Sequence, residues 1–485
     1  MKLNNLIQNL GFKKIGNINL KADIKNIVFD SRKTKHGDLF VAVKGVKADG
    51  AKFIGDAMAR GALTFVSQDK LVLKNKEEGY LKTKNCRIAL LGLAKNFFRN
   101  PQKKIKLVGI TGTNGKTTIT YIIESILRNA HTSCVVIGTI NCRFKNKIIP
   151  SSNTTPSPMD VYSLLNQMRD KKVRYCAIEV TSHALKQDRV DPKDFSYVIF
   201  TNITQDHLDY HKDINSYFLA KLRLFSGVSS RGTAIVNADD KYSSRIINMT
   251  KAHVITYGIR NKVDLSASSI KLSANASTFT VNFKNMSFQV STNLPGIYNV
   301  YNMLAAIAFC IKEKIPISII QKALSKVTVP GRLERVECFK ETFRIFVDFA
   351  HTEDALKNVC TALREIVKNR LIVVFGCGGD RDKTKRPRMG KVATELADFV
   401  FITSDNPRSE NPVDIIKDIK KGITKDNFHI EIDRKLAIMK AISKAVEGDI
   451  VLIAGKGHEK CQIFKDKVVE FDDRKVIKEC LKLLK

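Results

Sequence analysis

The sequence predicts an α/β protein with three domains, and three observations support this prediction. The chain has 485 residues, 44% of them hydrophobic, which suffices for several packed cores. Short apolar runs alternate with helical stretches along most of the chain, as in parallel sheets covered by helices. Two breaks, Asn100-Pro101 and Val329-Pro330-Gly331, separate stretches with different patterns. The predicted domains are residues 1–104, 105–331 and 332–485.

The first predicted domain is a small α/β unit. Its strands are the apolar runs KNIVF (25–29) and DLFVAV (38–43). The first residues contain no apolar segment followed by a small-residue cleavage site, so we expect no secretory signal. No apolar run in the sequence reaches the roughly 18–20 residues that cross a bilayer, so we expect no stable membrane insertion.

The second predicted domain is a doubly wound, mostly parallel sheet. Its predicted strands are residues 106–110, 134–138, 175–180, 197–201 and 233–238. Residues 264–290 alternate more strictly between apolar and polar side chains, which predicts an antiparallel addition. The third predicted domain is a second open, Rossmann-like α/β unit. Its predicted strands are residues 344–349, 371–376, 399–404 and 449–455.

Charge and cysteine content narrow the class of function. The chain has 82 Lys and Arg against 48 Asp and Glu, a net charge of +34. The basic residues are scattered singly, without the clusters typical of a nucleic-acid interface. We therefore favour solvated lysine-rich faces, with an anionic substrate as the next interpretation. The ten cysteines form no CxxC pair, which argues against a zinc site or disulfide framework and indicates a reducing cytosol. We expect a cytoplasmic monomer with no nucleic-acid partner.

The most specific local motif is GITGTNGKTT, residues 109–118, between a predicted strand and a predicted helix. Backbone N–H groups of such a loop point at phosphate oxygens, and the helix N-terminus adds positive potential. Lys116 is predicted to reach the β- and γ-phosphates, and the Thr117 hydroxyl to bind Mg²⁺. The strict P-loop pattern is not met, because Ile110 stands where its first glycine belongs. A simple tight turn is the less favoured alternative, so we interpret the central domain as P-loop ATPase-like.

The form TGTNGKTT is found in the Mur ligases of peptidoglycan synthesis and in the related folylpolyglutamate synthases. The chain resembles the Mur ligases over almost its whole length. The matching motifs, in the order of the family, are DSR (30–32), GDLFVAVKG (37–45), NTTPSP (153–158), EVTSHALKQDRV (179–190), TNITQDHLDYH (201–211), LAKLRLF (219–225), GIYNVYNMLAA (296–306), VPGRLE (329–334), VDFAHTEDAL (347–356), GCGGDRDKTKRPRM (376–389), SDNPRSE (404–410) and AGKGHE (454–459). The resemblance implies a UDP-sugar-binding N-terminal domain, an ATP-binding central domain and an amino-acid-binding C-terminal domain.

The resemblance implies sites for ATP and for two Mg²⁺ ions. The implied ATP-binding residues are Gly112, Thr113, Asn114, Gly115, Lys116, Thr117, Thr118, Asn302, Arg332, Asp348 and His351. The implied metal ligands are Thr117, Glu179, His207 and Lys221, the last as a carbamate. The implied catalytic residues are Lys116, Lys221 and His207.

Without the resemblance, two of these residues are open to plainer interpretations. Glu179 ends an apolar strand, where a carboxylate faces the ligand crevice of a doubly wound sheet but is also common as a surface or capping acid. Lys221 lies in an amphipathic stretch and would ordinarily be assigned to a solvated helix face.

Two further sets of residues are implied for the organic substrates. For a UDP-sugar peptide they are Phe29, Ser31, Val46, Lys47, Ala48, Asn153, Thr154, Thr155, Thr181, Gln187 and Arg189, with Asp30 as a neighbour. For the incoming amino acid they are Arg381, Asp405, Asn406, Pro407, Arg408, Gly455 and Glu459. In this family DNPR is typical of ligases that add meso-diaminopimelate, since Arg408 suits its distal carboxylate and Glu459 its distal ammonium. Considered alone, DNPR is an Asn-Pro turn.

The implied reaction is the ATP-dependent addition of meso-2,6-diaminopimelate to UDP-N-acetylmuramoyl-L-alanyl-D-glutamate through an acyl phosphate. These two molecules and ATP are the expected small-molecule partners. Two alternatives remain: the same kind of ligation with L-lysine (or, within the same group of ligases, glutamate), and a basic P-loop ATPase that acts on nucleic acid.

Overall fold

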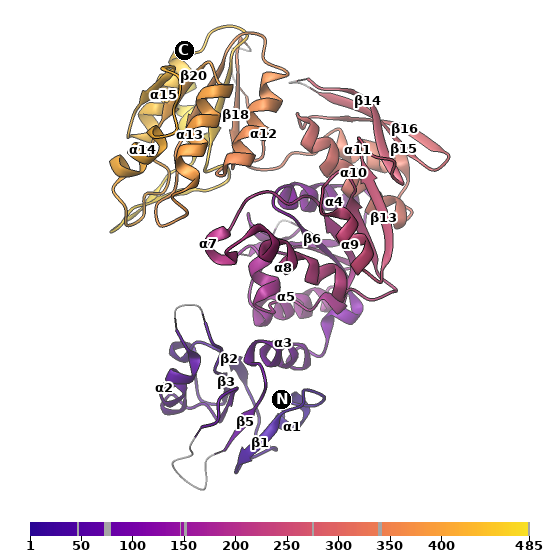
Figure 1. Ribbon diagram of the computed structural model, residues 1–485. Coiled ribbons are helices and arrows are strands. Elements are labelled where there is room, and N and C mark those ends of the chain that lie inside the picture. The colour runs from indigo at the N-terminus through magenta and orange to yellow at the C-terminus, as the bar shows by residue number, and fades with distance from the viewer. Residues whose placement is uncertain are drawn as a thin grey trace. The chain divides into compact units, whose positions relative to one another are not determined.

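The computed structural model describes residues 1–45, 48–71, 79–145, 147–149, 153–273, 276–337 and 342–483 (Figure 1). The predicted site residues Val46 and Lys47 lie outside these ranges. The chain forms two compact units. The first comprises Met1–Gly109, Ser133–Tyr197 and Arg223–Gly232, and the second Ile110–Thr132, Val198–Leu222 and Thr233–Lys485. The predicted bounds of the three domains remain predictions.

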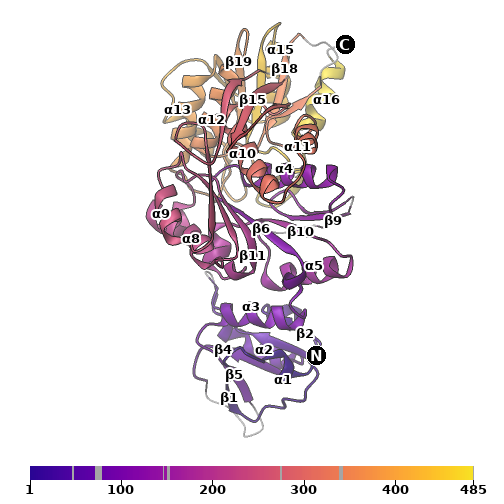
Figure 2. The same ribbon diagram turned by 90° about the vertical axis from the view of Figure 1, so that its right-hand side faces the viewer.

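The N-terminal part contains a five-stranded sheet in the order β1-β5-β4-β3-β2, in which only β1 runs antiparallel to its neighbour (Figure 2). Its strands are β1 (Lys13–Gly16), β2 (Asn26–Val28), β3 (Asp38–Val41), β4 (Thr64–Ser67) and β5 (Gly79–Lys82). Its helices are α1 (Leu3–Leu6), α2 (Ile54–Ala59) and α3 (Cys86–Phe97). Helix α3 begins where the Asn85 side chain accepts hydrogen bonds from the backbone N–H groups of Arg87 and Ile88. The two strands predicted here are confirmed as β2 and β3.

An eleven-stranded sheet follows, in the order β16-β15-β14-β13-β12-β11-β6-β10-β7-β8-β9. Its strands are β6 (Lys106–Thr111), β7 (Cys134–Ile137), β8 (Cys142–Phe144), β9 (Lys147–Ile149), β10 (Tyr175–Glu179), β11 (Phe195–Phe200), β12 (Thr233–Asn237), β13 (His253–Gly258), β14 (Leu265–Lys271), β15 (Ser277–Phe283) and β16 (Met286–Thr292). Strands β14, β15 and β16 pair antiparallel, which confirms the predicted addition. The antiparallel pairs β7–β8 and β8–β9 were not predicted.

Helices accompany this sheet. They are α4 (Lys116–Asn129), α5 (Pro158–Asp170), α6 (Ser182–Lys186), α7 (Leu208–His211), α8 (Ile214–Gly227), α9 (Ser243–Met249), α10 (Ile297–Lys312) and α11 (Ile317–Leu324). Short 3₁₀ helices occur at Ser31–Lys33, Gly50–Phe53, Pro101–Lys104 and Pro192–Asp194. In α4 the isoleucines at 119, 122, 123 and 126 are all buried, at the spacing of one helix face. Helix α4 also packs against α10 and α11, which holds in place the helix that follows the glycine-rich loop.

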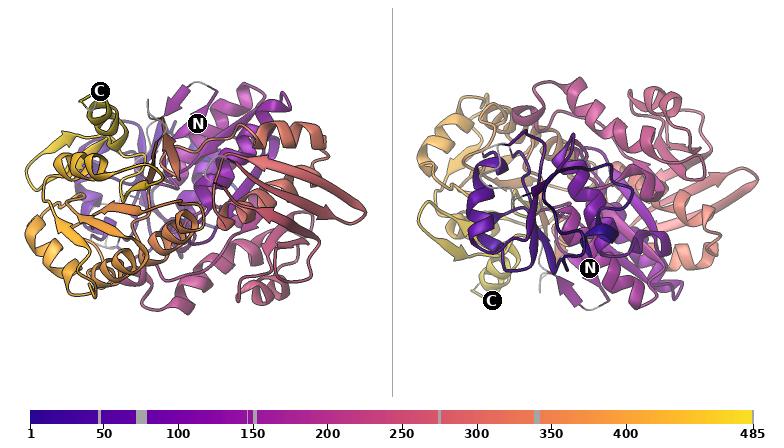
Figure 3. Two further views of the ribbon diagram at one scale, coloured as in Figure 1. Left: turned by 90° about the horizontal axis from the view of Figure 1, so that it is seen from above. Right: turned by 90° about the horizontal axis from the view of Figure 1, so that it is seen from below.

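The C-terminal part contains a six-stranded sheet in the order β17-β18-β22-β19-β20-β21, parallel except for the pair β17–β18. Its strands are β17 (Glu334–Val336), β18 (Arg344–Asp348), β19 (Leu371–Phe375), β20 (Phe399–Ile402), β21 (Phe428–Ile430) and β22 (Ile450–Ala454), with a separate hairpin of β23 (Cys461–Ile463) and β24 (Val468–Glu470). Its helices are α12 (Glu353–Arg364), α13 (Lys385–Leu396), α14 (Pro412–Lys420), α15 (Arg434–Lys444) and α16 (Asp473–Leu483). Two apolar clusters, one with α12, α13 and α14 and one with α15 and α16, cover opposite faces of the sheet (Figure 3). The prediction of an open α/β unit is confirmed.

An ion-pair network ties α3 to later residues of the same compact unit. The ammonium of Lys95, on α3, lies 2.6 Å from an Asp191 carboxylate oxygen and 2.9 Å from one of Asp194. The Tyr162 hydroxyl, on α5, donates to Asp194 as well. These polar contacts join α3, α5 and the segment 191–194, and α3 packs directly against α5.

The cysteines of the described residues are reduced thiols, and eight of these nine are buried. Burial raises the pKa of Cys86, Cys360 and Cys377 to about 12. Cys461, on β23, is the partly exposed one. Within the part of the chain that the structure describes, no helix is long and apolar enough to span a membrane.

Candidate functional site

The glycine-rich loop between β6 and α4 can be built only with glycine at two of its positions. Gly112 and Gly115 have positive φ angles of 147° and 88°. A Cβ atom on Gly112 would lie 1.8 Å from the Thr201 hydroxyl oxygen, and one on Gly115 would lie 2.3 Å from the Asn302 side-chain oxygen. The loop therefore lies tightly against the turn after β11 and against α10.

Hydrogen bonds hold the same loop in shape. The backbone N–H of Thr113 donates to the Asn202 carbonyl (2.8 Å), and the backbone N–H of Asn114 donates to the Asn202 side chain (3.0 Å). The Lys116 ammonium donates to the carbonyls of Gly112 (2.9 Å) and Thr113 (2.8 Å). The N-terminus of α4 thus lies beside the Lys116 ammonium. A helix N-terminus next to a cation is suited to binding phosphate.

Lys221 lies beside this loop and not on a solvated helix face. Its side chain is 2% exposed, and its ammonium donates to the Gly112 carbonyl at 2.9 Å. Its ammonium also lies 4.6 Å from the centre of the Tyr217 ring. Burial, together with the positive charge of Lys116, holds the pKa of Lys221 well below its ordinary value. The structure thus places two lysines at one loop and favours the neutral amine at Lys221.

The loop that carries His207 follows β11. His207 has a left-handed backbone conformation, with φ 55°, and its side chain is largely exposed. Burial opposes ionisation of the neighbouring Asp206, but the charges of His207, His351 and Lys116 outweigh it and lower the Asp206 pKa. A carboxylate therefore persists next to the predicted ligand His207.

Further predicted ATP-site residues gather around the start of the C-terminal sheet. Asp348 is buried at the end of β18 and accepts backbone hydrogen bonds from Leu333 (2.6 Å) and Ala350 (2.8 Å). The Arg332 guanidinium stacks over the Phe349 ring at 4.6 Å and donates to the Thr117 hydroxyl at 3.4 Å.

Three more predicted ATP-site residues are at least partly buried. Burial, with the charge of Lys385, lowers the pKa of His351 to about 4, so its imidazole is neutral at pH 7. Asn302 is buried on α10 and donates to the Asn299 side chain at 3.0 Å. Thr118 is buried in the first turn of α4.

Sequence analysis missed Asp354, in the first turn of α12. Its carboxylate accepts hydrogen bonds from the Asn114 amide (2.7 Å) and the Thr204 hydroxyl (3.0 Å). It thereby links the glycine-rich loop to the C-terminal sheet. The available signal was its place in the motif VDFAHTEDAL, where only Asp348 and His351 were selected.

The first compact unit contains a separate cluster of hydroxyl groups around Glu179. Glu179 is fully buried at the end of β10 and accepts hydrogen bonds from the backbone N–H (2.9 Å) and the hydroxyl (2.8 Å) of Thr139. The hydroxyls of Thr139 and Thr154 lie 3.1 Å apart. A Cβ on Gly138 would lie 2.2 Å from the Glu179 carboxylate, so the strand end before Thr139 needs glycine. Thr139 was missed, although it follows a predicted strand end.

The same cluster includes four more of the predicted residues. The Thr155 hydroxyl donates to the Glu179 carbonyl at 2.7 Å and lies 3.3 Å from the Thr181 hydroxyl. The Arg189 guanidinium donates to the Thr155 carbonyl (2.7 Å) and to the Gln187 side chain (2.8 Å). Asn153 precedes Thr154 and is exposed. The structure thus joins Thr154, Thr155, Thr181, Gln187 and Arg189 to Glu179 through one connected set of polar contacts, which includes Thr139.

The predicted residues of the N-terminal sheet lie apart from that cluster in the sequence. Ser31 is buried in the 3₁₀ helix that follows β2, and Asp30 caps that helix through the Arg32 backbone N–H. The Phe29 ring is 43% exposed. Ala48 is exposed, and its carbonyl accepts a hydrogen bond from the Gly45 backbone N–H at 2.8 Å.

Six of the seven residues predicted to bind the amino acid lie on two turns at one edge of the C-terminal sheet. The seventh, Arg381, lies between β19 and α13. We call the two turns the strand-end turns (residues 405–408 after β20 and 455–459 after β22). Both strands are parallel neighbours of β19, so their carboxyl ends meet at the same edge. A Cβ on Gly455 would lie 2.6 Å from an Asp405 carboxylate oxygen. This close approach requires glycine and holds the two turns together.

Arg408 has a strained backbone, and a hydrogen bond fixes the direction of its side chain. Its φ is 54°, an uncommon conformation for a residue with a side chain. Its backbone N–H donates to the Ile463 carbonyl (3.0 Å) and its guanidinium to the Gly379 carbonyl (2.7 Å). Burial and the charge of the exposed Arg381 lower the Arg408 pKa. The guanidinium thus occupies an electropositive place where an added carboxylate is favourable.

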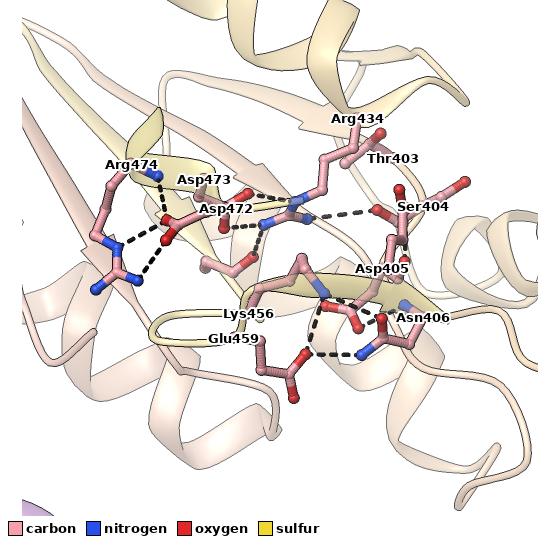
Figure 4. Close-up of polar contacts among 12 residues, drawn as sticks. Thr403, Ser404, Asp405, Asn406, Arg434, Lys456, Glu459, Asp472, Asp473 and Arg474 are labelled. Atoms are coloured by element: carbon pink, nitrogen blue, oxygen red, sulfur yellow. Dashed lines mark hydrogen bonds and ion pairs between the residues drawn. The ribbon is translucent and has the colours of Figure 1, made fainter. Parts of the chain in front are cut away.

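A fully buried ion pair supports both strand-end turns (Figure 4). Arg434, at the start of α15, binds the Asp473 carboxylate through two hydrogen bonds of 2.8 Å, and both side chains are inaccessible to solvent. Arg434 also donates to the carbonyl of Ala454, the last residue of β22, at 3.0 Å. The pair therefore connects two helices to the strand that ends at Ala454, directly before Gly455.

We expect Asp473→Ala to destabilise the C-terminal sheet by about 3–5 kcal/mol, because it leaves a buried guanidinium uncompensated. Urea unfolding of wild type and variant measures the change. The matched control is Glu479→Ala on the same helix, which breaks the exposed pair with Lys435 and should leave the unfolding midpoint nearly unchanged. Equal midpoints for Asp473→Ala and wild type would contradict the supporting role.

A metal site made only of protein side chains is not evident. Among the described residues, no group of three or more His, Cys, Asp or Glu side chains is placed to hold a metal ion. The predicted ligands differ from such a group, since they include the Thr117 hydroxyl and a modified Lys221.

The three sheets, the glycine-rich loop with its lysine and the strand-end turns define a class of protein that family models also identify. The chain belongs to the Mur ligase family: residues 23–97 match the Mur ligase family, catalytic domain, residues 110–310 the Mur ligase middle domain, and residues 331–457 the Mur ligase, glutamate ligase domain. The predicted resemblance and the three-domain α/β fold are thereby confirmed.

Individual relatives are similar along their whole length. The chain is 44% identical to the UDP-N-acetylmuramoyl-L-alanyl-D-glutamate--2,6-diaminopimelate ligase of Clostridium perfringens (strain 13 / Type A), with 99% of each chain covered. It is 43% identical to the enzyme of the same name from Clostridium tetani (strain Massachusetts / E88), with 100% of each covered. A solved structure of a ligase of that name is 29% identical, with a TM-score of 0.71 over 100% of this chain and 99% of that one.

Proposed function

We propose that this chain is an ATP-dependent ligase that joins meso-2,6-diaminopimelate to UDP-N-acetylmuramoyl-L-alanyl-D-glutamate in peptidoglycan precursor synthesis. Relatives named for this reaction support the proposal at 42–44% identity over 99–100% of the chain. The observation that carries it is the pair of strand-end turns, which presents the Arg408 guanidinium and the Glu459 carboxylate at one sheet edge. These two charges complement the distal carboxylate and ammonium of diaminopimelate.

The chemistry begins with activation of a carboxylate. The D-glutamate carboxylate of the nucleotide substrate attacks the γ-phosphorus of ATP, which forms an acyl phosphate and releases ADP. The diaminopimelate amine then attacks the acyl carbon, and phosphate leaves from the tetrahedral intermediate. Lys116 and the α4 N-terminus offset the phosphate charge, so the chain contributes mainly positioning and electrostatics.

The residues of the ATP site would act through contacts with the nucleotide. The backbone of the glycine-rich loop surrounds the phosphates, while Arg332 supplies a second cation. The proposed ATP-binding set is Gly112, Thr113, Asn114, Gly115, Lys116, Thr117, Thr118, Asn302, Arg332, Asp348 and His351.

The proposed magnesium ligands are Thr117, Glu179, His207 and Lys221. Hydroxyl, carboxylate and imidazole groups are suitable donors, and the lowered pKa of Lys221 favours the neutral amine that adds to carbon dioxide. That addition forms an N–C bond, breaks one N–H bond and releases a proton, so the buried neutral amine becomes a carbamate anion. Bound Mg²⁺ supplies further charge neutralisation during phosphoryl transfer.

Lys221→Ala should lose most activity, and short carboxylic acids added to the assay should restore part of it by replacing the missing anion. Lys221→Arg keeps a cation that cannot be carbamylated, so it should stay inactive. Release of phosphate measures each variant, and isotope-labelled bicarbonate reports the carbamate by NMR. Full activity of Lys221→Arg would contradict the carbamate.

The nucleotide substrate is proposed to bind the first compact unit. The proposed residues are Phe29, Ser31, Val46, Lys47, Ala48, Asn153, Thr154, Thr155, Thr181, Gln187 and Arg189. The exposed Phe29 ring offers a stacking surface, and the hydroxyl cluster around Glu179 offers donors for sugar and phosphate oxygens. The amino acid is proposed to contact Arg381, Asp405, Asn406, Pro407, Arg408, Gly455 and Glu459.

A coupled assay of phosphate release tests the proposal, with diaminopimelate, L-lysine and glutamate supplied in turn. We expect release only when ATP, the nucleotide dipeptide and diaminopimelate are all present. Release with L-lysine would assign the alternative ligase, and stimulation by DNA alone would assign a nucleic-acid-dependent ATPase. We propose that the reaction takes place in the cytoplasm and that the enzyme is a monomer.

A further inference from the structure

Lys456, between Gly455 and Glu459, is a charged residue that the proposed amino-acid site does not include. Its side chain is fully buried. Its ammonium donates three hydrogen bonds: to the Asn406 side-chain oxygen (3.0 Å), a Glu459 carboxylate oxygen (3.1 Å) and the Cys461 carbonyl (2.7 Å) (Figure 4). An ammonium group has three N–H donors, so each is used.

These contacts decide how Asn406 is oriented. Its side-chain oxygen accepts hydrogen bonds from Lys456 and from the Ile463 backbone N–H (3.0 Å), neither of which can accept in return. Its amide nitrogen must therefore point the other way, and it donates to Glu459 at 2.8 Å. The orientation follows from the two fixed donors on one side of the amide.

The contacts also orient Glu459. One carboxylate oxygen, Oε2, receives hydrogen bonds from both Lys456 and Asn406. The other, Oε1, receives none from the described residues, and the side chain is 31% exposed. One oxygen is thus held in place while the other stays available to an incoming donor.

Lys456 further balances the charge of the strand-end turns. Without it, Glu459 and Asp405 would face Arg408 as two carboxylates against one guanidinium, and a side chain that ends in a lone ammonium would be favoured. With it, the charges within the two turns are even, and the nearby Arg381 adds one further cation, so an end that carries a carboxylate as well as an ammonium is favoured over a lone ammonium.

We infer that Lys456 is a positioning residue that orients Asn406 and Glu459 and thereby selects an amino acid whose distal end is zwitterionic. This inference rests on the proposed function and adds a determinant that acts through two proposed ligands. It predicts a specific kinetic signature, because Lys456 is not proposed to contact ATP or the nucleotide substrate.

Lys456→Met is expected to raise KM for diaminopimelate by about 10²-fold, because it removes one partner of a hydrogen-bonded charge pair. KM for ATP and for the nucleotide dipeptide should stay within about twofold, and the preference for diaminopimelate over L-lysine should narrow by about tenfold or more. The control Lys435→Met removes an exposed lysine of the same domain and should leave all three KM values unchanged.

The double variant Lys456→Met/Glu459→Gln removes both charges and so leaves no buried charge unpaired. If Lys456 acts through Glu459, its effect on KM for diaminopimelate should be clearly less than the product of the two single effects. The inference would be overturned if the effects of the two single substitutions on KM simply multiplied in the double variant. It would also be overturned if Lys456→Met lowered kcat and left KM for diaminopimelate unchanged. Should wild type release no phosphate in response to diaminopimelate, the proposed function itself fails, which is a separate outcome.

Discussion

Wild-type enzyme is expected to prefer diaminopimelate to L-lysine by about 10⁴–10⁵-fold in kcat/KM, and Arg408→Ala is expected to remove most of that preference. L-Lysine lacks the distal carboxylate, so it would leave the Arg408 guanidinium desolvated and without an anion. The variant should lose activity with diaminopimelate while barely improving with L-lysine, since it creates no contact to the lysine ammonium. The measurement is kcat/KM for both amino acids on both proteins.

Arg408→Lys is the matched control for this prediction. It retains the charge but not the planar fork that binds a carboxylate through two hydrogen bonds, so intermediate discrimination is expected. A wild-type preference below about a hundredfold would place the selectivity in the shape of the site, because size differences alone supply about 10–200-fold. The role of Arg408 would then have to be withdrawn.

Lys116→Ala is expected to reduce ATP turnover by at least about 10²–10³-fold, the loss typical of one preorganised charge-stabilising donor. Its ammonium lies over the glycine-rich loop, on the carbonyls of Gly112 and Thr113. Binding of the nucleotide dipeptide should persist, because Ser31 and Thr154 belong to the other compact unit. Phosphate release measures the first effect and titration calorimetry the second.

Lys312→Ala, which removes an exposed lysine at the end of α10, provides the control for that variant. It should match wild type in both measurements. If Lys116→Ala reduced ATP turnover and binding of the nucleotide dipeptide equally, the substitution would be disturbing the fold. The role of Lys116 in phosphate binding would then be unsupported.

Much of the fold could be predicted because uninterrupted apolar runs become buried strands. The predicted strands at 175–180 and 371–376 correspond to β10 and β19, whose residues are all buried. Strands β8 and β9 were missed because each has three residues, and β9 is mostly exposed at the sheet edge. Such short segments carry too little apolar pattern to be recognised.

The candidate site could be predicted where its residues form continuous motifs, and Lys221 marks the limit of that approach. The stretch SYFLAKLRLF is amphipathic, and its pattern would assign a lysine to the solvated face of the helix. The structure places Lys221 four residues after Tyr217 and three after Phe218, on the same buried side of α8. Only the tertiary contact with the glycine-rich loop explains a buried lysine there.

The contacts of Arg434 and Asp354 could not be predicted from sequence for a related reason. Their partners are distant in the chain: Arg434 pairs with Asp473, 39 residues away, and Asp354 with Asn114, 240 residues away. Each acquires its role only after the sheets have formed. The family motifs indicated where ligands bind but not which side chains hold those ligands in position.

In the described part of the chain, eight of the nine thiols are buried, which leaves Cys461 as a native attachment point for a fluorophore. Maleimide reagents attack the thiolate, which a buried thiol with a pKa near 12 does not supply at neutral pH. Cys461 is partly exposed, and its carbonyl accepts the Lys456 hydrogen bond. With Cys338, which lies outside the described residues, replaced by serine, a dye on Cys461 would sit one hydrogen bond away from the strand-end turns. Its emission could then follow amino-acid arrival in real time, without turnover of ATP.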